Sequence, residues 1–265
     1  MFDWLTSLPR PNGIVEIANH DDFDRFTQAY LQVRQQEGRL YNDELLRQLP
    51  HPPPSHPLAP EWRARAESAH RLIQHLKQQT TATATLRVLE IGSGNGWLTH
   101  QIAAALTSSA VIGLDINRPE LEQAARVFKP APNLAFVFGE AKHLAAHAPA
   151  YFDIIILASA VQYFANLPAQ VRLWQNLLRP NGQIHILDSP FYTKKTLPKA
   201  KLASRQYYQR LGVPELAQHY HAHDITSWLQ FQPRLMYDPS ALKNRLQRRL
   251  GLGAYSPFQW WCLHV

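Results

Sequence analysis

The chain lacks several features that whole classes of protein require. It has a single cysteine, Cys262, so it cannot close an internal disulfide, and a multi-cysteine zinc or iron–sulfur site is excluded. No apolar run approaches the roughly 20 residues that a membrane-spanning helix needs. The first 14 residues contain no apolar core of the kind found in signal peptides. We therefore expect a soluble, cytoplasmic protein with no metal centre.

Acidic residues are outnumbered by basic ones, 20 against 27, which gives a net charge of +7 and an isoelectric point of about 9.6. Such a balance suits an acidic small molecule, an anionic surface or nucleic acid. The basic residues are spread out, however, and the densest group, Lys243, Arg245, Arg248 and Arg249, has the spacing of a solvated helix face. Nucleic acid is therefore not the partner that we expect.

Residues 1–80 have a helical pattern with one break. Apolar residues recur at helical spacing over Asp21–Gln36, and again after Pro60. Between them, residues 51–60 include five prolines, which prevent a regular helix. We expect residues 1–80 to form a helical cap or lid, and residues 81–265 to form the main domain.

From Leu86 onward, short apolar runs alternate with helical patterns. This alternation predicts an α/β fold with a doubly wound, mostly parallel sheet. An insertion over about 189–232, with a helix at 194–211, interrupts the pattern before two last strands, which we expect to form an antiparallel hairpin at the C-terminus. We predict a Rossmann-like sheet of seven strands, at 86–91, 110–114, 134–138, 152–157, 183–187, 234–237 and 258–265.

A glycine-rich loop follows the first of these strands. The sequence Glu90-Ile91-Gly92-Ser93-Gly94-Asn95-Gly96 leads from an apolar run directly into a helical pattern. Glycines at alternate positions allow a sharp turn and a close approach of a ligand to the backbone. The spacing differs from the G-x-G-x-x-G of nicotinamide-binding domains, and no Gly-Lys-Ser/Thr of a phosphate-binding loop follows.

Polar side chains follow three further strands of the predicted sheet. Asp115 ends the second strand, where a carboxylate can accept hydrogen bonds from both hydroxyls of a ribose, and Ile116 and Asn117 come next. The third strand is followed by Glu140 and Ala141, and the fourth by Ser159 and Gln162.

In this order, these motifs resemble the class I S-adenosylmethionine (SAM)-dependent methyltransferases, in particular the small-molecule branch that includes enzymes of ubiquinone and menaquinone biosynthesis. The resemblance covers residues 86–190 and implies SAM as the cofactor and S-adenosylhomocysteine as its product. The sequence departs from the family pattern at Glu140, where aspartate is more common. The resemblance implies a cofactor pocket made by Glu90, Gly92, Ser93, Gly94, Asn95, Gly96, Asp115, Ile116, Asn117, Glu140, Ala141, Ser159 and Gln162.

Within that set, the resemblance places Glu90 and the glycines at the methionine end, Asp115 at the ribose and Glu140 at the adenine. Ser159 and Gln162 would face the sulfonium. The segment before the first strand covers the cofactor in related enzymes, so Arg63 or Arg65 is a candidate for the SAM carboxylate, with a plain surface position as the alternative.

The methyl acceptor is less well indicated. Three histidines at alternate positions, His219, His221 and His223, lie in the insertion, and His221 or His223 is our candidate general base for a hydroxyl acceptor. We expect a small molecule methylated on oxygen. Basic residues in the insertion are compatible with an anionic group on it: Lys194, Lys195, Lys199, Lys201 and Arg205.

Two alternatives stay open. An RNA methyltransferase would explain the basic charge and would bind RNA in a steeply salt-dependent way. A non-catalytic protein that keeps the fold as a binding module is the other, although the intact glycines and Asp115 favour an enzyme.

Overall fold

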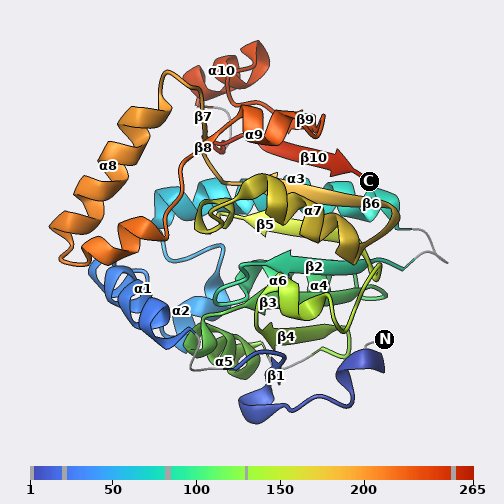
Figure 1. Cartoon of the computed structure of the whole chain (residues 1–265). Coiled ribbons are helices and arrows are strands. Elements are labelled where there is room, and N and C mark those ends of the chain that lie inside the picture. The colour runs from blue at the N-terminus through green and yellow to red at the C-terminus, as the bar shows by residue number, and fades with distance from the viewer. Residues whose placement is uncertain (1–2, 20–22, 81–84, 129–130, 252–254) are drawn as a thin grey trace.

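The computed structural model describes residues 3–19, 23–80, 85–128, 131–251 and 255–265 (Figure 1). Its main sheet has eight strands in the order β1-β4-β3-β2-β5-β6-β10-β9. The strands are β1 (Val15–Glu16), β2 (Arg87–Ile91), β3 (Ala110–Asp115), β4 (Leu134–Phe138), β5 (Phe152–Ala158), β6 (Leu178–Leu187), β9 (Arg234–Tyr237) and β10 (Trp260–His264).

The predicted fold class is confirmed. Strands β1 to β6 pair in parallel, and β10 pairs antiparallel with both β6 and β9. The sheet has one strand more than the seven expected, because Val15–Glu16 adds in parallel to β4. Ile14 and Val15 are buried there, so the N-terminal region, which we expected to form a helical cap, also covers the edge of the sheet next to β4.

Helices cover both faces of this sheet. The helices are α1 (Asp24–Gln36), α2 (Asp43–Gln48), α3 (Ala59–Gln79), α4 (Trp97–Ala105), α5 (Arg118–Val127), α6 (Ala141–Leu144), α7 (Leu167–Leu177), α8 (Leu197–Arg210), α9 (Thr226–Leu229) and α10 (Leu242–Arg249). Successive residues of the buried strands face opposite layers: Val88 and Ile154 pack with α3, α4 and α5, whereas Leu89 and Ile155 pack with α6, α7 and α9. The central strands are therefore apolar on both faces, as parallel strands usually are.

The described part of the cap region contains the helices α1, α2 and α3 and two short 3-10 helices, Asp3–Leu5 and Pro11–Gly13. Helix α1 occupies residues 24–36 of the predicted 21–36, and residues 20–22 lie outside the described ranges. The proline-rich stretch is irregular, as predicted, between the end of α2 and the start of α3. Ala29 and Val33 of α1 pack against Tyr208 of α8 and Leu216 of the 3-10 helix η5 (Pro214–Gln218). The cap therefore contacts the insertion, and Figure 1 shows α1 and α8 along the same side of the molecule.

The insertion and the C-terminal hairpin follow the predicted outline. Helix α8 lies within the predicted 194–211. A two-stranded parallel sheet, β7 (Phe191–Tyr192) with β8 (His223–Asp224), brackets it and was not predicted. Strand β9 spans the residues predicted for it, and β10 lies within the predicted 258–265. Among the described residues, no helix is long and apolar enough to cross a membrane.

Candidate active site

Two adjoining cavities lie at the carboxyl ends of the parallel strands. The chain forms β2, β3 and β4 outward on one side of the sheet and then returns to form β5 on the other side of β2. Ligands of doubly wound folds bind at such a switch point. The larger cavity, about 360 Å³, reaches from Gly92 to Glu140 and is called the main cavity here. The smaller, about 100 Å³, is called the side cavity and extends from the same glycine loop towards Arg39.

The glycine loop lines both cavities, and its glycines have different roles. A Cβ at Gly92 would lie 2.6 Å from the Cβ of Ala160, and one at Gly96 would lie 2.5 Å from the Phe136 ring. Gly92 lets the loop after β2 approach the segment after β5, and Gly96 lets the start of α4 approach β4. At Gly94 the nearest atom is Glu120 Oε2, at 3.3 Å, so the positive φ of 52° is its main requirement.

Three acids surround this loop, of which Glu90 is buried and Asp115 and Glu120 are partly buried. Glu90 is 2% exposed and accepts a hydrogen bond of 2.5 Å from Thr99 Oγ1, and burial raises its pKa to about 8. Asp115 accepts hydrogen bonds from the backbone N–H groups of Gly94, at 2.7 Å, and Asn117, at 2.8 Å. Burial raises the pKa of Asp115 despite these donors. At Glu120, burial and the nearby charge of Asp115 raise the pKa to about 7.

A network of ion pairs lies beside the side cavity, which its three arginines line. Glu37 pairs with Arg34 at 2.9 Å and with Arg39 at 3.1 Å. Glu61 accepts two hydrogen bonds from Arg39, at 2.7 and 2.6 Å, and pairs with Arg65 at 2.9 Å. Three arginines thus share two glutamates, and this network carries one excess positive charge. It joins the end of α1 to α3.

Arg65 continues the network to the sheet. Its Nη1 donates to Ser159 Oγ at 3.2 Å, and that hydroxyl donates to the backbone oxygen of Asp188 at 3.1 Å. Of the two arginines that the sequence offered, Arg65 lines the side cavity, whereas Arg63 is exposed.

The structure brings together almost all the predicted cofactor residues. The main cavity is lined by Gly92, Gly94, Asp115, Ile116, Asn117, Glu140, Ala141 and Ser159. The side cavity is lined by Arg65, Glu90, Gly92, Ser93, Gly94, Asn95 and Ser159. Gly96 and Gln162 line neither, although Gln162 Nε2 donates to the backbone oxygen of Ser159 at 2.5 Å. The individual roles assigned to these residues stay predictions.

The two histidines predicted to be catalytic line neither of these cavities. His223 is buried in β8 with its Nε2 3.1 Å from the backbone oxygen of Val161, and the backbone N–H of His221 donates to the backbone oxygen of Gln162 at 2.6 Å. Burial lowers the pKa of both imidazoles. His219 does line the main cavity, with its ring 5.2 Å from that of Phe26. The role of His221 or His223 as a base stays a prediction.

The basic residues of the insertion are also absent from the main and side cavities. All five side chains are exposed, and none of them lines the main or the side cavity: Lys194, Lys195, Lys199, Lys201 and Arg205. An anionic acceptor in the cavities would therefore meet other cations.

Sequence reasoning missed a group that α1 contributes. Phe26, Tyr30 and Arg34 are spaced four residues apart and lie on one face of the helix. Phe26 and Tyr30 line the main cavity, and Tyr30 and Arg34 line the side cavity. The Arg34 guanidinium lies 4.6 Å from the centre of the Tyr30 ring and 3.5 Å from the Tyr163 hydroxyl. The i, i+4 spacing was the available signal.

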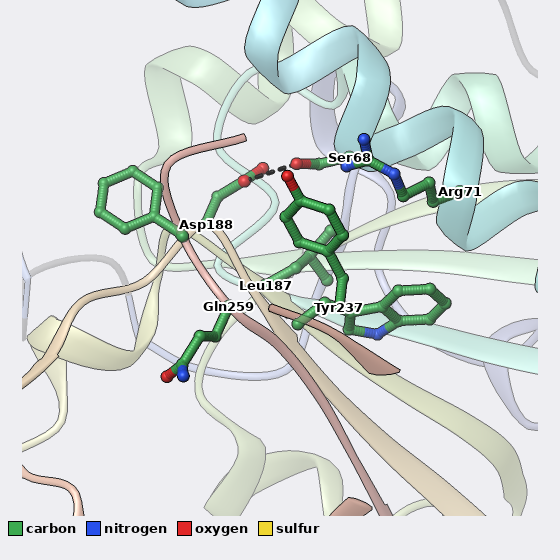
Figure 2. A pocket seen from close by; sticks show the side chains of 8 residues that line it. Ser68, Arg71, Leu187, Asp188, Tyr237 and Gln259 are labelled. Carbon is green, nitrogen blue, oxygen red and sulfur yellow. Dashed lines mark hydrogen bonds between the residues drawn. The ribbon is translucent and has the colours of Figure 1, made fainter. Parts of the chain in front are cut away.

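A third, much smaller cavity of about 10 Å³ lies at the end of β6 (Figure 2). Asp188, at a φ of 52°, accepts hydrogen bonds from Ser68 Oγ at 2.7 Å and Ser256 Oγ at 3.0 Å. Figure 2 shows Asp188 and Ser68 pointing toward each other, beside Tyr237. This contact ties α3 and the C-terminal segment to the sheet, so we interpret it as structural.

Comparison with known proteins identifies the family. A family model described as a methyltransferase domain matches residues 82–245, more than half of the chain. The chain belongs to the class I SAM-dependent methyltransferases. The family and the cofactor inferred from the sequence motifs are thereby confirmed.

Curated relatives are similar over part of their length. A malonyl-[acyl-carrier protein] O-methyltransferase of Halalkalibacterium halodurans is 31% identical over 43% of this chain and 44% of its own. A ubiquinone biosynthesis O-methyltransferase of Aromatoleum aromaticum is 29% identical over 37% of this chain and 42% of its own. The chain thus matches less than half the length of these relatives.

Solved structures share the fold. The geranyl diphosphate C-methyltransferase of Streptomyces coelicolor, in complex with Mg²⁺, geranyl diphosphate and S-adenosylhomocysteine, has a TM-score of 0.55 and 12% identity. The alignment covers 80% of this chain and 84% of that one. At this identity the likeness concerns the fold alone.

The residues at the cavities fit the cofactor. Within the described part of the chain, Ser93 Oγ and Gln162 Oε1 are buried without a hydrogen-bond partner, and they lie in and beside the predicted cofactor site. Buried polar atoms normally have partners, and SAM carries amino, carboxylate, hydroxyl and adenine groups that can supply them. The positive-φ glycines leave backbone accessible between the two cavities.

Proposed function

We propose that this enzyme transfers the methyl group of SAM to an oxygen atom of a small acidic acceptor, and that a carboxylate oxygen is the acceptor class. The observation that carries the proposal is the position of Arg34. Its side chain is 22% exposed, lines the side cavity and lies against Tyr30, a residue that lines both cavities, and its guanidinium is positively charged at neutral pH.

Bound SAM would supply a methyl group on a positively charged sulfur, which is already a good leaving group. We assign Asp115 to the ribose hydroxyls, Glu140 to the adenine and Arg65 to the cofactor carboxylate. Ser159 and Gln162 would lie at the face where the acceptor approaches. These assignments rest on the family resemblance, and the lining of the cavities supports those of Asp115, Glu140, Arg65 and Ser159.

Arg34 has capacity for an additional anion. Its neighbour Glu37 is shared with Arg39 and also accepts a hydrogen bond from the Tyr207 hydroxyl. Burial disfavours the charge of Arg34, but nearby acidic groups such as Glu37 raise its pKa well above the usual value. A carboxylate is the matching partner because it accepts charge-assisted hydrogen bonds from the planar guanidinium.

The two tyrosines around Arg34 support the same acceptor. Burial raises the pKa of both Tyr30 and Tyr163, so both hydroxyls stay protonated near neutral pH. They can therefore donate hydrogen bonds to an anionic acceptor but cannot remove a proton from a neutral one. A carboxylate is already ionised at neutral pH, so the protein would need only to hold it in line with the methyl group.

The name of one relative agrees with this class. The enzyme of Halalkalibacterium halodurans methylates a malonyl group on oxygen, as its name states, and a malonyl thioester has one free carboxylate. The Aromatoleum aromaticum relative acts in ubiquinone biosynthesis. A neutral hydroxyl acceptor would need a base, and His221 or His223 would then have to supply it.

Labelled SAM and a paired acceptor panel test the proposal. One arm contains dicarboxylic and tricarboxylic acids and their monothioesters, and the other contains phenols and catechols. We expect label in base-labile methyl esters from the first arm. Arg34→Gln should lower kcat/KM for the acid by about 10- to 100-fold, the value of a charged hydrogen bond, with little change in SAM affinity.

The matched control is Arg47→Gln, because Arg47 is an exposed arginine of α2 that lines neither the main nor the side cavity. It should leave turnover unchanged. His221→Ala and His223→Ala should keep turnover of the acid. Label only in methyl ethers, lost in a histidine variant and unchanged in Arg34→Gln, would contradict the carboxylate proposal and favour a base-assisted hydroxyl acceptor.

A further inference from the structure

Helix α10 carries a stripe of exposed leucines. Leu242 is 82% exposed, Leu246 55% and Leu250, directly after the helix, 61%. Residues four apart lie on the same face of a helix, so the three side chains form one continuous apolar strip. None of the residues of α10 is buried.

The helix faces the protein with its polar side. Asn244, which lies on the opposite face from the leucines, donates a hydrogen bond of 2.6 Å from Nδ2 to the backbone oxygen of Asp238. A surface helix normally turns its apolar stripe to the core and its polar face to water. In α10 this orientation is reversed, and the leucines point away from the fold.

Basic side chains flank the leucine stripe on both sides. At 100° per residue, Lys243 lies on one side of the stripe, and Arg245 and Arg249 lie on the other. Arg248 lies over the ring of Tyr255, 5.3 Å from its centre, and Tyr255 is itself 39% exposed. No acidic residue occurs from position 239 to position 265. The face is therefore cationic and apolar together.

We propose that α10 docks the enzyme on an anionic lipid surface. A helix with an apolar face and flanking lysines and arginines lies in the interface of a bilayer, with its leucines at the acyl boundary and its cations at acidic headgroups. Long basic side chains reach the headgroups while their stems stay along the apolar strip. Nucleic acid would match the charges but would leave the leucines in water.

The position of α10 suits this role. Strand β10 is antiparallel to β6, and Tyr237 at the end of β9 pairs with Trp260 at the start of β10. The segment between β9 and β10 therefore leaves the sheet at the edge where the parallel strands end, which is the edge that holds the cavities. Figure 1 shows α10 at the outer end of the sheet, next to β9. Lipid binding through α10 would hold that edge near the surface.

Sedimentation of the full-length enzyme with vesicles tests the proposal. The vesicles are pure phosphatidylcholine, or the same lipid with one third replaced by phosphatidylglycerol. We expect binding to the mixed vesicles that weakens with added salt, and no binding to the neutral ones. Leu242→Ser with Leu246→Ser, and separately Arg245→Gln with Arg249→Gln, should each weaken binding at least tenfold.

The control is Leu202→Ser, because Leu202 is 56% exposed on α8, away from this face. It should bind like the wild type, and all variants should bind SAM equally. Failure of the wild type to sediment with the mixed vesicles would overturn the proposal. So would leucine variants that bind as well as the wild type. Equal binding to heparin or RNA that is lost only in the arginine variants would assign the helix to nucleic acid instead.

Discussion

The packing of the glycine loop leads to a quantitative prediction about Gly96. This residue has a φ of 72° and directly precedes α4 as its N-cap. A Cβ at this position would lie 2.5 Å and 2.7 Å from two atoms of the Phe136 ring and 2.8 Å from the Cβ of Ala124. Phe136 and Ala124 are buried in the core on the same face of the sheet, so neither has free space into which to move.

The chain offers a matched control for the backbone effect. Gly212 has the same φ of 72°, and nothing lies within 4 Å of a Cβ built there. Gly212→Ala should cost only the strain of a left-handed residue, about 1–2 kcal/mol. Gly96→Ala should add the cost of overpacking a filled core, about 1–3 kcal/mol. We therefore expect Gly96→Ala to lose about 1–3 kcal/mol more than Gly212→Ala.

Urea unfolding, followed by tryptophan fluorescence, measures this difference. The free energy of unfolding of the wild type and of both variants is extrapolated to water, and the slopes should be equal. Equal losses in the two variants would refute the reasoning, because they would show that the loop is not held by close contact with Phe136 and Ala124.

Three further predictions concern buried charge and polar contacts. Burial raises the pKa of Glu90 to about 8, so the stability that this group contributes is complete below about pH 4.5 and is lost as the pH rises to about 8. Thermal unfolding without ligand should therefore show that Glu90→Gln loses less stability over this pH range than the wild type does. Parallel stability–pH curves for the two proteins would contradict this prediction. Asp188 accepts from two serine hydroxyls, so Asp188→Ala should cost about 1–3 kcal/mol in urea unfolding, whereas Asp188→Asn, which keeps an acceptor and tolerates a positive φ, should cost less. A double-mutant cycle of Arg39→Gln and Glu61→Gln should give a coupling free energy of about 1 kcal/mol, because the ion pair is bidentate but partly exposed. A coupling free energy near zero would show that Arg39 does not stabilise the protein through Glu61.

The sheet was largely predictable from the sequence. Buried parallel strands are apolar on both faces, so β2 to β5 appeared as continuous apolar runs, and helical periodicity between them located α4, α5 and α7. Strand β1 was not predicted because it has only two residues. Its pairing with β4 depends on the tertiary fold and has no local pattern.

The cofactor residues were predictable for a related reason. A parallel sheet places the ends of its strands at one edge, so residues that follow strands, such as Asp115 and Glu140, come together whatever the details of packing. The ion-pair network beside the side cavity could not be predicted in this way. Arg34 and Arg65 are 31 positions apart in the sequence, and only the tertiary fold, which joins the end of α1 to α3 through ion pairs, makes them line one cavity.

The histidines show where spacing alone misleads. Alternate residues share one side only if the chain is extended throughout. His219 directly follows η5 as its C-cap, with near-helical dihedral angles of φ −101° and ψ −1°, and of the three only His223 belongs to a strand. The three imidazoles therefore do not share one side, and His219 is the one that lines the main cavity.

The measurement that tests the assigned cofactor site most directly is a calorimetric titration with SAM and with S-adenosylhomocysteine. It compares the wild type, Asp115→Ala, and Asp43→Ala as a control whose carboxylate pairs with Arg126 away from the main and side cavities. We predict micromolar binding of both ligands to the wild type and to the control, and none to Asp115→Ala with its fold intact by circular dichroism. Equal binding by all three proteins, or no binding to the wild type, would contradict the assigned site.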